Sequence, residues 1–325
     1  MSKIKFLLFI TLLTSSFLTG CSYSNTENET ENRKNIDFIA KMSNGDYWDS
    51  VKLGANEAAK EFNVNLNFIG PMKETDVSEQ LRELNQASNG KSDGIILAPA
   101  DYKALSEVTS KIFDKKIPII IVDSAISTNK ITGYIASDNK AAGQKLGEKL
   151  IDLVGKESTV GIINFVKGAK NAEEREAGAV STFSKFPDVK IAAIEYCMSD
   201  KKLAYELTKK MISSHNKLNG IIALSAIASD GAAEAIDDMH LKEKIKLVTF
   251  DNSIEEISYI ENGVIEASLV QQQFNMGYLA VKYAAMSARG EKIPKKFITN
   301  SIIIDKSSLY LPQYEKIIFP FINES

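Results

Sequence analysis

The sequence has few residues of the kinds that bind metals or form disulfides. It contains two cysteines and two histidines among 325 residues. Cys21 follows an N-terminal apolar segment, and one remaining thiol, Cys197, cannot form an internal disulfide. Neither His215 nor His240 has a second soft ligand nearby in the sequence. We therefore expect no zinc site, and no other metal or cofactor is indicated.

The sequence also lacks a strong excess of charge and the signature loops of nucleotide-binding proteins and hydrolases. Its formal net charge is −3, and lysines and arginines are scattered along the chain. A nucleic-acid-binding protein usually needs a basic face, so we expect no nucleic-acid partner. No Gly-x-x-x-x-Gly-Lys-Ser/Thr loop, Gly-x-Gly-x-x-Gly turn or Gly-x-Ser-x-Gly elbow is present. What remains is an ordinary folded composition, 44% hydrophobic, long enough for about two domains.

The N-terminal segment has the features of a secretion signal. Lys3 and Lys5 precede an apolar run over residues 6–18, which is too short to span a bilayer comfortably. Small residues then lead to Leu-Thr-Gly-Cys21, which resembles a bacterial lipobox. We expect residues 1–20 to be a lipoprotein signal peptide, Cys21 to carry the lipid, and residues 21–35 to form a flexible polar tether. The alternative is an ordinary signal peptide with a chance cysteine. Lipidation predicts a protein held at the extracellular face of the cell membrane.

From Ile36 onward, short apolar runs alternate with amphipathic stretches. Trp48, Val51, Ala55 and other apolar residues recur at helical spacing, and Asp200 is placed to cap a helix reaching residue 214. The runs are rich in β-branched residues and mostly do not alternate, which is typical of parallel strands buried on both faces. We expect strands at residues 37–40, 64–69, 94–98, 118–122, 132–136, 159–165, 189–196, 220–224, 245–250 and 264–270. The pattern predicts an α/β protein with doubly wound parallel sheets.

A weak internal repeat places an aspartate at matching positions in the two halves. Residues 94–98 lead through a helix to 119–122 and Asp123, and residues 220–224 lead through a helix to 246–250 and Asp251. Ligands of open α/β sheets bind outside the carboxyl ends of the strands. Two similar lobes facing each other would therefore bring both acids toward one cleft. The alternative role for each aspartate is a helix N-cap or a structural hydrogen bond in a turn.

Other side chains suited to binding hydroxyl groups accompany the two acids. Tyr47 and Trp48 follow the first strand and can stack on the C–H face of a sugar ring, or else pack at a helix start. Arg175 can donate several hydrogen bonds from one plane, or else lie on a solvated helix face. Gln271 follows a strand and offers an amide. A glycosidase acid pair is a further alternative, but a nearby arginine would favour ionisation of both carboxyls.

The span from Ile36 to about Pro320 resembles the type I periplasmic sugar-binding family, specifically the ribose-binding group. The resemblance rests on five segments in order, namely residues 119–123, Ala-Ser-Asp-Asn at 136–139, Arg-x-x-Gly at 175–178, Val-Thr-Phe-Asp at 248–251, and Gln271. It implies two lobes joined by a hinge of three crossings near Ser137, Gln271 and Ser301. One lobe would comprise residues 36–137 and 272–301, and the other residues 138–271 and 302–325. It also implies a binding protein, not an enzyme.

The resemblance further implies roles for individual residues. It implies that Tyr47 and Trp48 stack on the sugar ring. It also implies that four residues make polar contacts with the sugar: Asp123, Arg175, Asp251 and Gln271. Lys41, Asn171 and Ser225 are implied as secondary contacts. The chain departs from the family pattern at three positions, where Ser124, Ser199 and Lys41 replace an arginine, an aromatic residue and a small polar residue. We therefore expect a ligand other than ribose bound in the usual way.

Three segments are similar to those of binding proteins that partner a membrane sensor histidine kinase, including a xylose-sensing type. They are residues 44–48, residues 164–172 and the Ile-Ile-Phe-Pro-Phe ending at 317–321. This similarity favours a pentose, best D-xylose, as the ligand and a sensor histidine kinase as the partner. The alternative partner is the permease of an ABC sugar importer. The residue chemistry by itself does not separate these two partners.

Overall fold

The computed structural model describes residues 33–319. The predicted signal peptide, Cys21, most of the tether and residues 320–325 lie outside the described residues. The first strand, β1 (Lys34–Ile39), begins two residues before the expected start of the folded body at Ile36. The expected boundary between tether and lobe at residue 35 is therefore wrong by two residues, because Lys34 and Asn35 already pair with the neighbouring strand.

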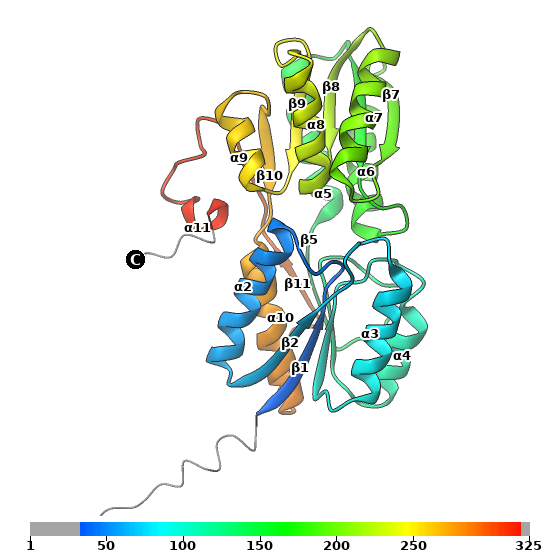
Figure 1. The fold of residues 1–325 in the computed structure, drawn as a ribbon, viewed down its shortest axis with the longest axis vertical. Helices are drawn as coiled ribbons and strands as arrows, with labels where there is room; N and C mark the ends of the chain where they lie inside the picture. Colours follow the sequence, from blue (N-terminus) through cyan, green and yellow to red (C-terminus); the bar gives the residue numbers. More distant parts are fainter. Residues whose placement is uncertain (1–32, 320–325) are drawn as a thin grey trace, which may run out of the picture. The chain divides into compact units, whose positions relative to one another are not determined.

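The first lobe is built on a six-stranded sheet in which every neighbouring pair is parallel (Figure 1). Consecutive residues of β1 point to opposite faces, and Phe38 and Ile39 join different hydrophobic clusters with no exposed surface. The sheet is thus buried on both sides, as its continuous apolar runs predict. Its strand order is β11 (Lys296–Thr299), β5 (Gly133–Ser137), β4 (Ile119–Val122), β3 (Gly94–Leu97), β1 and β2 (Val64–Ile69).

The second lobe has its own six-stranded sheet, which is mixed rather than wholly parallel. Its last strand pairs antiparallel with β10, at the edge of the sheet. The expectation of purely parallel sheets is wrong at this edge, where a short connection from the other lobe forces the strand to enter in the reverse direction. The strand order is β12 (Ile302–Ile304), β10 (Ala267–Val270), β9 (Lys246–Phe250), β8 (Leu218–Ala223), β6 (Thr159–Asn164) and β7 (Lys190–Tyr196).

Helices cover both faces of each sheet (Figure 1). The predicted cap at Asp200 is confirmed, because its carboxylate accepts a hydrogen bond from the Leu203 N–H at the start of α7. In the first lobe the helices are α2 (Asp46–Glu61), α3 (Val77–Asn89), α4 (Ser106–Asp114) and α10 (Gln273–Ala288). In the second they are α5 (Asn139–Val154), α6 (Lys170–Phe183), α7 (Lys201–Ser214), α8 (Ala226–Asp238), α9 (Ile254–Glu261) and α11 (Glu315–Ile318).

The chain passes between the two lobes three times. Strand β5 of the first sheet ends at Ser137 and is followed by α5, which packs on the second sheet. Strand β10 of the second sheet ends at Val270 and is followed by α10, which packs on the first sheet. Strand β11 of the first sheet ends at Thr299, and β12 of the second sheet starts at Ile302. Each lobe is therefore assembled from segments far apart in the sequence.

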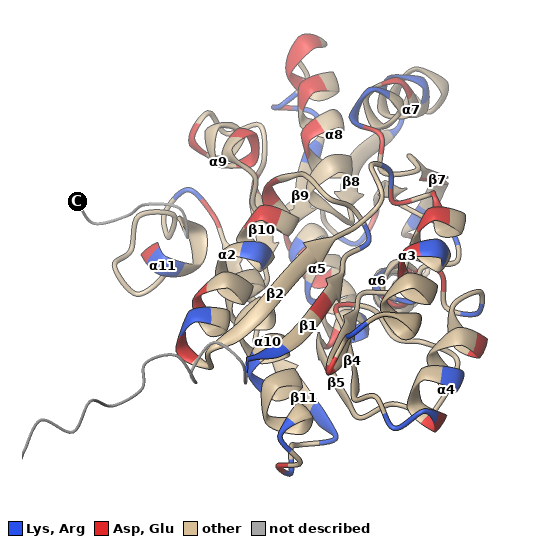
Figure 2. Cartoon of the chain, turned by 60° about the horizontal axis from the view of Figure 1, so that its bottom comes forward, with Lys and Arg blue, Asp and Glu red and all other residues tan. Residues whose placement is uncertain are grey.

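Charged side chains of both signs are distributed over the elements (Figure 2). Many form local pairs, such as Lys111 with Glu107 on α4 and Lys60 with Glu57 on α2. Among residues 33–319, no helix is both long enough and apolar enough to cross a membrane. Cys197 is fully buried, and burial raises the pKa of its thiol to about 11, which makes the thiolate scarce at neutral pH.

Candidate functional site

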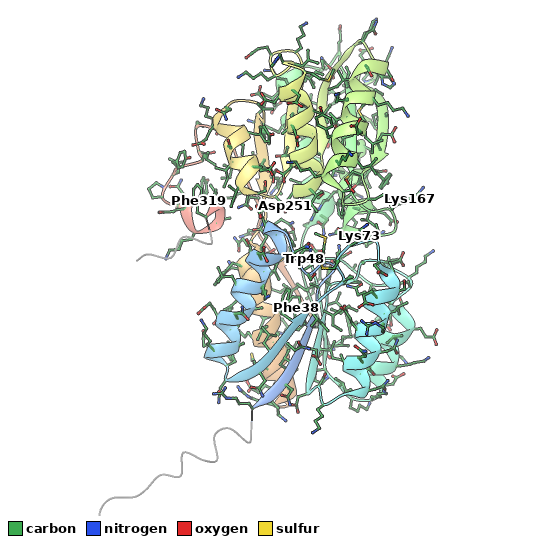
Figure 3. All side chains as sticks on the ribbon, in the orientation of Figure 1. Phe38, Trp48, Lys73, Lys167, Asp251 and Phe319 are labelled. Atoms are coloured by element: carbon green, nitrogen blue, oxygen red, sulfur yellow. The ribbon has the colours of Figure 1, made fainter. Side chains whose placement is uncertain are left out.

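A cavity of about 200 Å³ lies between the lobes, and residues of both lobes line it. Figure 3 labels Trp48 and Asp251, which lie on opposite sides of the region between the sheets. Eight of the nine residues proposed from the sequence as ligand contacts line this cavity: Lys41, Tyr47, Trp48, Asp123, Asn171, Arg175, Ser225 and Asp251. The ninth, Gln271, is buried behind Asp251 and is not part of the lining. Residues as far apart in the chain as Lys41 and Asp251 thus converge on one small cavity.

Asp123 and Asp251 occupy equivalent positions at the carboxyl ends of β4 and β9. Each donates its backbone N–H to the next strand, Asp123 to the Ile135 carbonyl at 2.9 Å and Asp251 to the Leu269 carbonyl at 2.8 Å. Both adopt positive φ angles, 66° and 80°. Non-glycine residues seldom adopt this conformation except where the surroundings impose it, often at functional sites. The alternative role as a helix N-cap is wrong for Asp251, because Ser253 caps α9.

Arg175 lies on α6 and is 2% exposed, so the alternative of a solvated helix-face arginine is wrong. Its Nε donates to Asn139 Oδ1 at 2.9 Å and its Nη1 to the Leu224 carbonyl at 2.8 Å. The guanidinium lies 3.6 Å from the ring centre of Phe250, which adds a cation–π contact. These contacts hold the planar group rigidly at the cavity wall and leave Nη2 without a hydrogen bond to any described residue.

The Asp251 carboxylate lies beside this guanidinium. Its Oδ1 accepts from Gln271 Nε2 at 2.7 Å and its Oδ2 accepts from the Ala226 N–H at 3.3 Å. Arg175 Nη1 lies 4.0 Å from Oδ2. Burial raises the pKa of the Asp251 carboxyl, while Arg175 and Gln271 act in the opposite direction. Because a carboxylate offers about four lone-pair positions, the two bonds leave acceptor capacity on the cavity side.

The aromatic pair sits at the start of α2 on the first-lobe side of the cavity. Trp48 is 5% exposed and belongs to the hydrophobic core, so it both packs in the lobe and lines the cavity. The Tyr47 and Trp48 rings meet edge to face with centres 5.1 Å apart. The Tyr47 hydroxyl donates to Asp123 Oδ1 at 2.9 Å. Burial, reinforced by the Asp123 charge, raises the Tyr47 pKa well above its ordinary value, so the hydroxyl keeps its proton.

The Lys41 ammonium is almost completely buried in the wall of the cavity. Its Nζ lies 2.9 Å from Asp123 Oδ2, 3.0 Å from Asn171 Oδ1 and 3.4 Å from Glu74 Oε1. Asn171 in turn donates from Nδ2 to Asp123 Oδ2 at 3.0 Å. Unlike Asp251, Asp123 is thus surrounded by protein donors, with Tyr47 on one oxygen and Lys41 and Asn171 on the other.

The chain matches a protein-family model described as a periplasmic binding protein domain, over residues 36–292. The chain belongs to this family. The resemblance to type I periplasmic binding proteins of the ribose-binding group is thereby confirmed, as is the two-lobed α/β architecture. Members of the family are solute-binding proteins, so the expectation that the chain is not an enzyme is also confirmed, and the glycosidase alternative is set aside.

Individual relatives carry names that describe sugar binding. The ribose import binding protein RbsB of Bacillus subtilis is 24% identical over 296 residues, covering 88% of this chain and 94% of RbsB. A carbohydrate transporter solute-binding protein from Agrobacterium radiobacter, solved in complex with D-arabinose, superposes with a TM-score of 0.86 at 28% identity, covering 88% and 99% of the two chains. A chain of the XylFII–LytSN complex superposes with a TM-score of 0.80 at 27% identity, covering 85% and 99%.

Several cavity residues of this binding protein are not evident from its sequence pattern. Glu74 and Ser199 lie in loops that follow β2 and β7, and Ser199 donates to Glu74 Oε2 at 2.6 Å. Phe165 follows β6 directly, and its ring contacts both Lys41 and Arg175. All three follow the carboxyl ends of predicted strands, so the rule that selects Asp123 and Asp251 also reaches them. Glu74 has no motif that distinguishes it from other polar loop residues, whereas Phe165 and Ser199 fall at positions that the family resemblance already singles out.

Asp230 is a further cavity residue that sequence reasoning missed, because it looks like an ordinary polar residue of a surface helix. It lies on α8 and accepts a hydrogen bond from Ser253 Oγ at 2.6 Å. Burial raises the pKa of its carboxyl to about 7, and the charges of Glu255 and Asp46 act in the same direction. Lys201 acts in the opposite direction. This acid therefore titrates far closer to neutrality than an exposed aspartate.

Proposed function

We propose that this protein binds a small monosaccharide in the cavity between its lobes. The observation that carries the proposal is the pairing of a rigid donor, Arg175, with an acceptor, Asp251, opposite the aromatic residues Tyr47 and Trp48. A hydroxyl group both donates and accepts, so adjacent hydroxyls of a sugar match such a pair. The C–H face of a sugar ring matches the aromatic surface.

The size of the cavity supports a monosaccharide rather than an oligosaccharide. About 200 Å³ is small beside the roughly 300–1,000 Å³ of pockets that hold drug-sized ligands. Buried side chains, Lys41 and Asp251 among them, line the cavity. Among monosaccharides, we propose a pentose, D-xylose. The proposal is supported by the sequence similarity to xylose-sensing binding proteins at residues 44–48 and 164–172.

Calorimetry of the chain against D-xylose, D-ribose, L-arabinose, D-galactose and D-glucose tests this proposal. We expect one tight, saturable response with one site per chain, and we expect it from D-xylose. Tighter binding of a hexose would overturn the pentose assignment. Heats no larger than dilution with all five sugars would overturn the assignment of the ligand class.

We further propose that the sugar-loaded protein docks on a membrane partner while held to the membrane through a lipid on Cys21. The names of the relatives, an import binding protein and a transporter component, support the permease of an ABC importer. A sensor histidine kinase is the second candidate, supported by the motif similarity and by the existence of a complex between the XylFII relative and LytSN.

Cells that lack the protein distinguish these two partners. Loss of the uptake of labelled sugar, restored by the wild-type gene, is the result expected for an importer component. Unchanged uptake combined with loss of sugar-dependent gene induction is the result expected for a kinase partner. A strain that retains both responses would overturn both partner proposals.

A further inference from the structure

The Lys41 group connects the two lobes through side chains. Lys41, Glu74 and Asp123 belong to the first lobe, where they follow β1, β2 and β4. Asn171 and Ser199 belong to the second lobe, at the start of α6 and in the loop after β7. Within this group, three side-chain hydrogen bonds cross between the lobes: Lys41 to Asn171 at 3.0 Å, Asn171 to Asp123 at 3.0 Å, and Ser199 to Glu74 at 2.6 Å. Other interlobe hydrogen bonds lie beside or outside the group, including Asn171 N–H to Ser124 Oγ at 3.3 Å, Ile254 N–H to Asp46 Oδ2 at 2.9 Å and Tyr102 N–H to the Gly168 carbonyl at 3.0 Å.

The ammonium of Lys41 has three protein oxygens around it, one as a hydrogen-bond acceptor and two as ion-pair partners. An ammonium carries three N–H bonds and no acceptor. Its three neighbours within 3.4 Å are oxygens of Asp123, Asn171 and Glu74. A ligand hydroxyl would have to displace one of these oxygens to bond with Lys41. This differs from Arg175 and Asp251, which keep donor and acceptor capacity on the cavity side.

Burial strengthens these interlobe hydrogen bonds. Lys41 is 1% exposed, Asn171 3% and Glu74 8%. Charge-assisted hydrogen bonds away from water are stronger than exposed ones, and removing one member of a buried ion pair leaves its partner uncompensated. If the lobes separated, every one of the three crossing bonds would be lost together.

We propose that Lys41 is a positioning residue: it forms an interlobe latch with Glu74, Asp123, Asn171 and Ser199, and sets the open–closed equilibrium rather than touching the sugar. The latch itself does not depend on sugar binding, and only its effect on ligand affinity rests on the proposed sugar-binding function. A latch that stabilises the closed form raises ligand affinity by reducing the cost of closure. Recognition then falls to other residues that line the cavity, among them Arg175, Asp251 and Ser225.

The latch is tested by measuring the distance between the lobes in the protein without sugar. Dyes are attached to cysteines introduced at Lys60 on α2 and Lys185 after α6, whose side chains are 73% and 57% exposed. Cys21→Ser removes the one competing thiol, since Cys197 is fully buried. Single-molecule energy transfer between the dyes then gives the fraction of closed molecules for each variant.

Lys41→Met keeps an unbranched apolar side chain of similar length and removes the ammonium. We expect the ratio of closed to open molecules to fall about tenfold or more, since each lost crossing bond is worth roughly a factor of ten. Ser199→Ala, which removes one crossing bond from the other lobe, should lower the ratio less. The matched control is Lys115→Met, because Lys115 bonds only to Ser88 and Asn89 of its own lobe.

An unchanged ratio in both Lys41→Met and Ser199→Ala, with circular dichroism showing a folded protein, would overturn the latch. An equal fall in Lys115→Met would also overturn it, because the effect would then be general. The readout needs no sugar, so it stands if the ligand assignment fails. Asp251→Ala should leave the ratio unchanged while it weakens sugar binding, which separates the latch from the proposed function.

Discussion

At the scale of single residues, the two strand-end aspartates are alike in backbone and unlike in chemistry. Both follow a buried strand, adopt a positive φ and donate their N–H to the neighbouring strand. Asp123 is engaged by Tyr47, Lys41 and Asn171, whereas Asp251 is held by one amide and one backbone N–H. Asp123 therefore belongs to a network of protein side chains and Asp251 keeps acceptor capacity for a ligand, although the two occupy equivalent positions in the fold.

Replacing Asp251 by alanine should weaken sugar binding by about 2–4 kcal/mol, because the change leaves buried donors of the ligand and of Gln271 unpaired. Titration calorimetry of variant and wild type with the same sugar measures the difference. The control is Asp237→Ala, which removes an exposed acid of the same lobe and should leave affinity unchanged. Affinity of Asp251→Ala within twofold of wild type would remove Asp251 from the site.

Sequence patterns locate the residues that follow strands better than they describe what those residues do. Asp123 and Asp251 stand out because each ends a run of buried β-branched residues. Lys41 is placed correctly beside the cavity, but its role depends on Glu74 and Asn171, which lie 33 and 130 positions away. No local spacing of residues along the chain encodes contacts between such distant positions. The contact with Asn171 arises only when the two lobes meet.

At the scale of elements, close helix packing positions the recognition arginine. Helices α5 and α6 approach each other at Gly143, where an added Cβ would lie 2.0 Å from the Arg175 carbonyl oxygen. Gly178 makes the reciprocal approach, with an added Cβ 2.2 Å from the Lys140 carbonyl oxygen. The backbone of Arg175 is thus clamped against α5, and its guanidinium is directed into the cavity from a rigid support.

Gly143→Ala should therefore affect both stability and binding. The new methyl group must push α6 away from α5, which we expect to lower the free energy of unfolding by about 1–3 kcal/mol. The displacement moves Arg175 and should also weaken sugar binding at least tenfold. Urea denaturation and calorimetry measure the two effects, with Lys145→Ala on the solvent face of α5 as the control. Unaltered binding in a destabilised Gly143→Ala would show that this contact does not position Arg175.

Strongly apolar elements are predictable from this sequence, and the two short strands β11 and β12 are not. Runs such as Ile119–Val122 are buried at every position, so their period and composition identify them. Strand β11 has three exposed residues among four, and β12 has three residues in all. Both are held in place by their neighbours β5 and β10. Both are too short to show the period of a strand, although β12 consists of three isoleucines, and pairing with a neighbouring strand rather than local burial holds them in the sheets.

At the scale of the whole molecule, discontinuous lobes and a cavity between them suit a protein that opens and closes. Few residues need to move, because only the segments after Ser137, Val270 and Thr299 connect the lobes. Rotation about such segments is a common mode of domain closure. The resemblance to a known family predicts this architecture, whereas composition and periodicity alone predict only two α/β units of unspecified connection.

The predicted lipid anchor determines where this motion takes place. Replacing Cys21 by serine should remove the acceptor thiol, so that the protein is no longer labelled by radioactive palmitate and appears in the medium or as an uncleaved precursor. Cell fractionation and lipid labelling measure the outcome. Cys197→Ser is the control, because this thiol is buried and should not accept a lipid. Membrane retention of the Cys21→Ser protein at wild-type levels would refute the anchor.

The position of Trp48 gives the protein a built-in optical signal. It is the only tryptophan in the chain, and its indole lines the cavity beside the Tyr47 ring. Indole emission depends on the polarity and water content of its surroundings, so a solute entering the cavity changes the fluorescence of the whole molecule from one site. The unlabelled protein can therefore act as its own indicator, and with a fluorimeter its ligand can be sought directly in cell extracts or growth media.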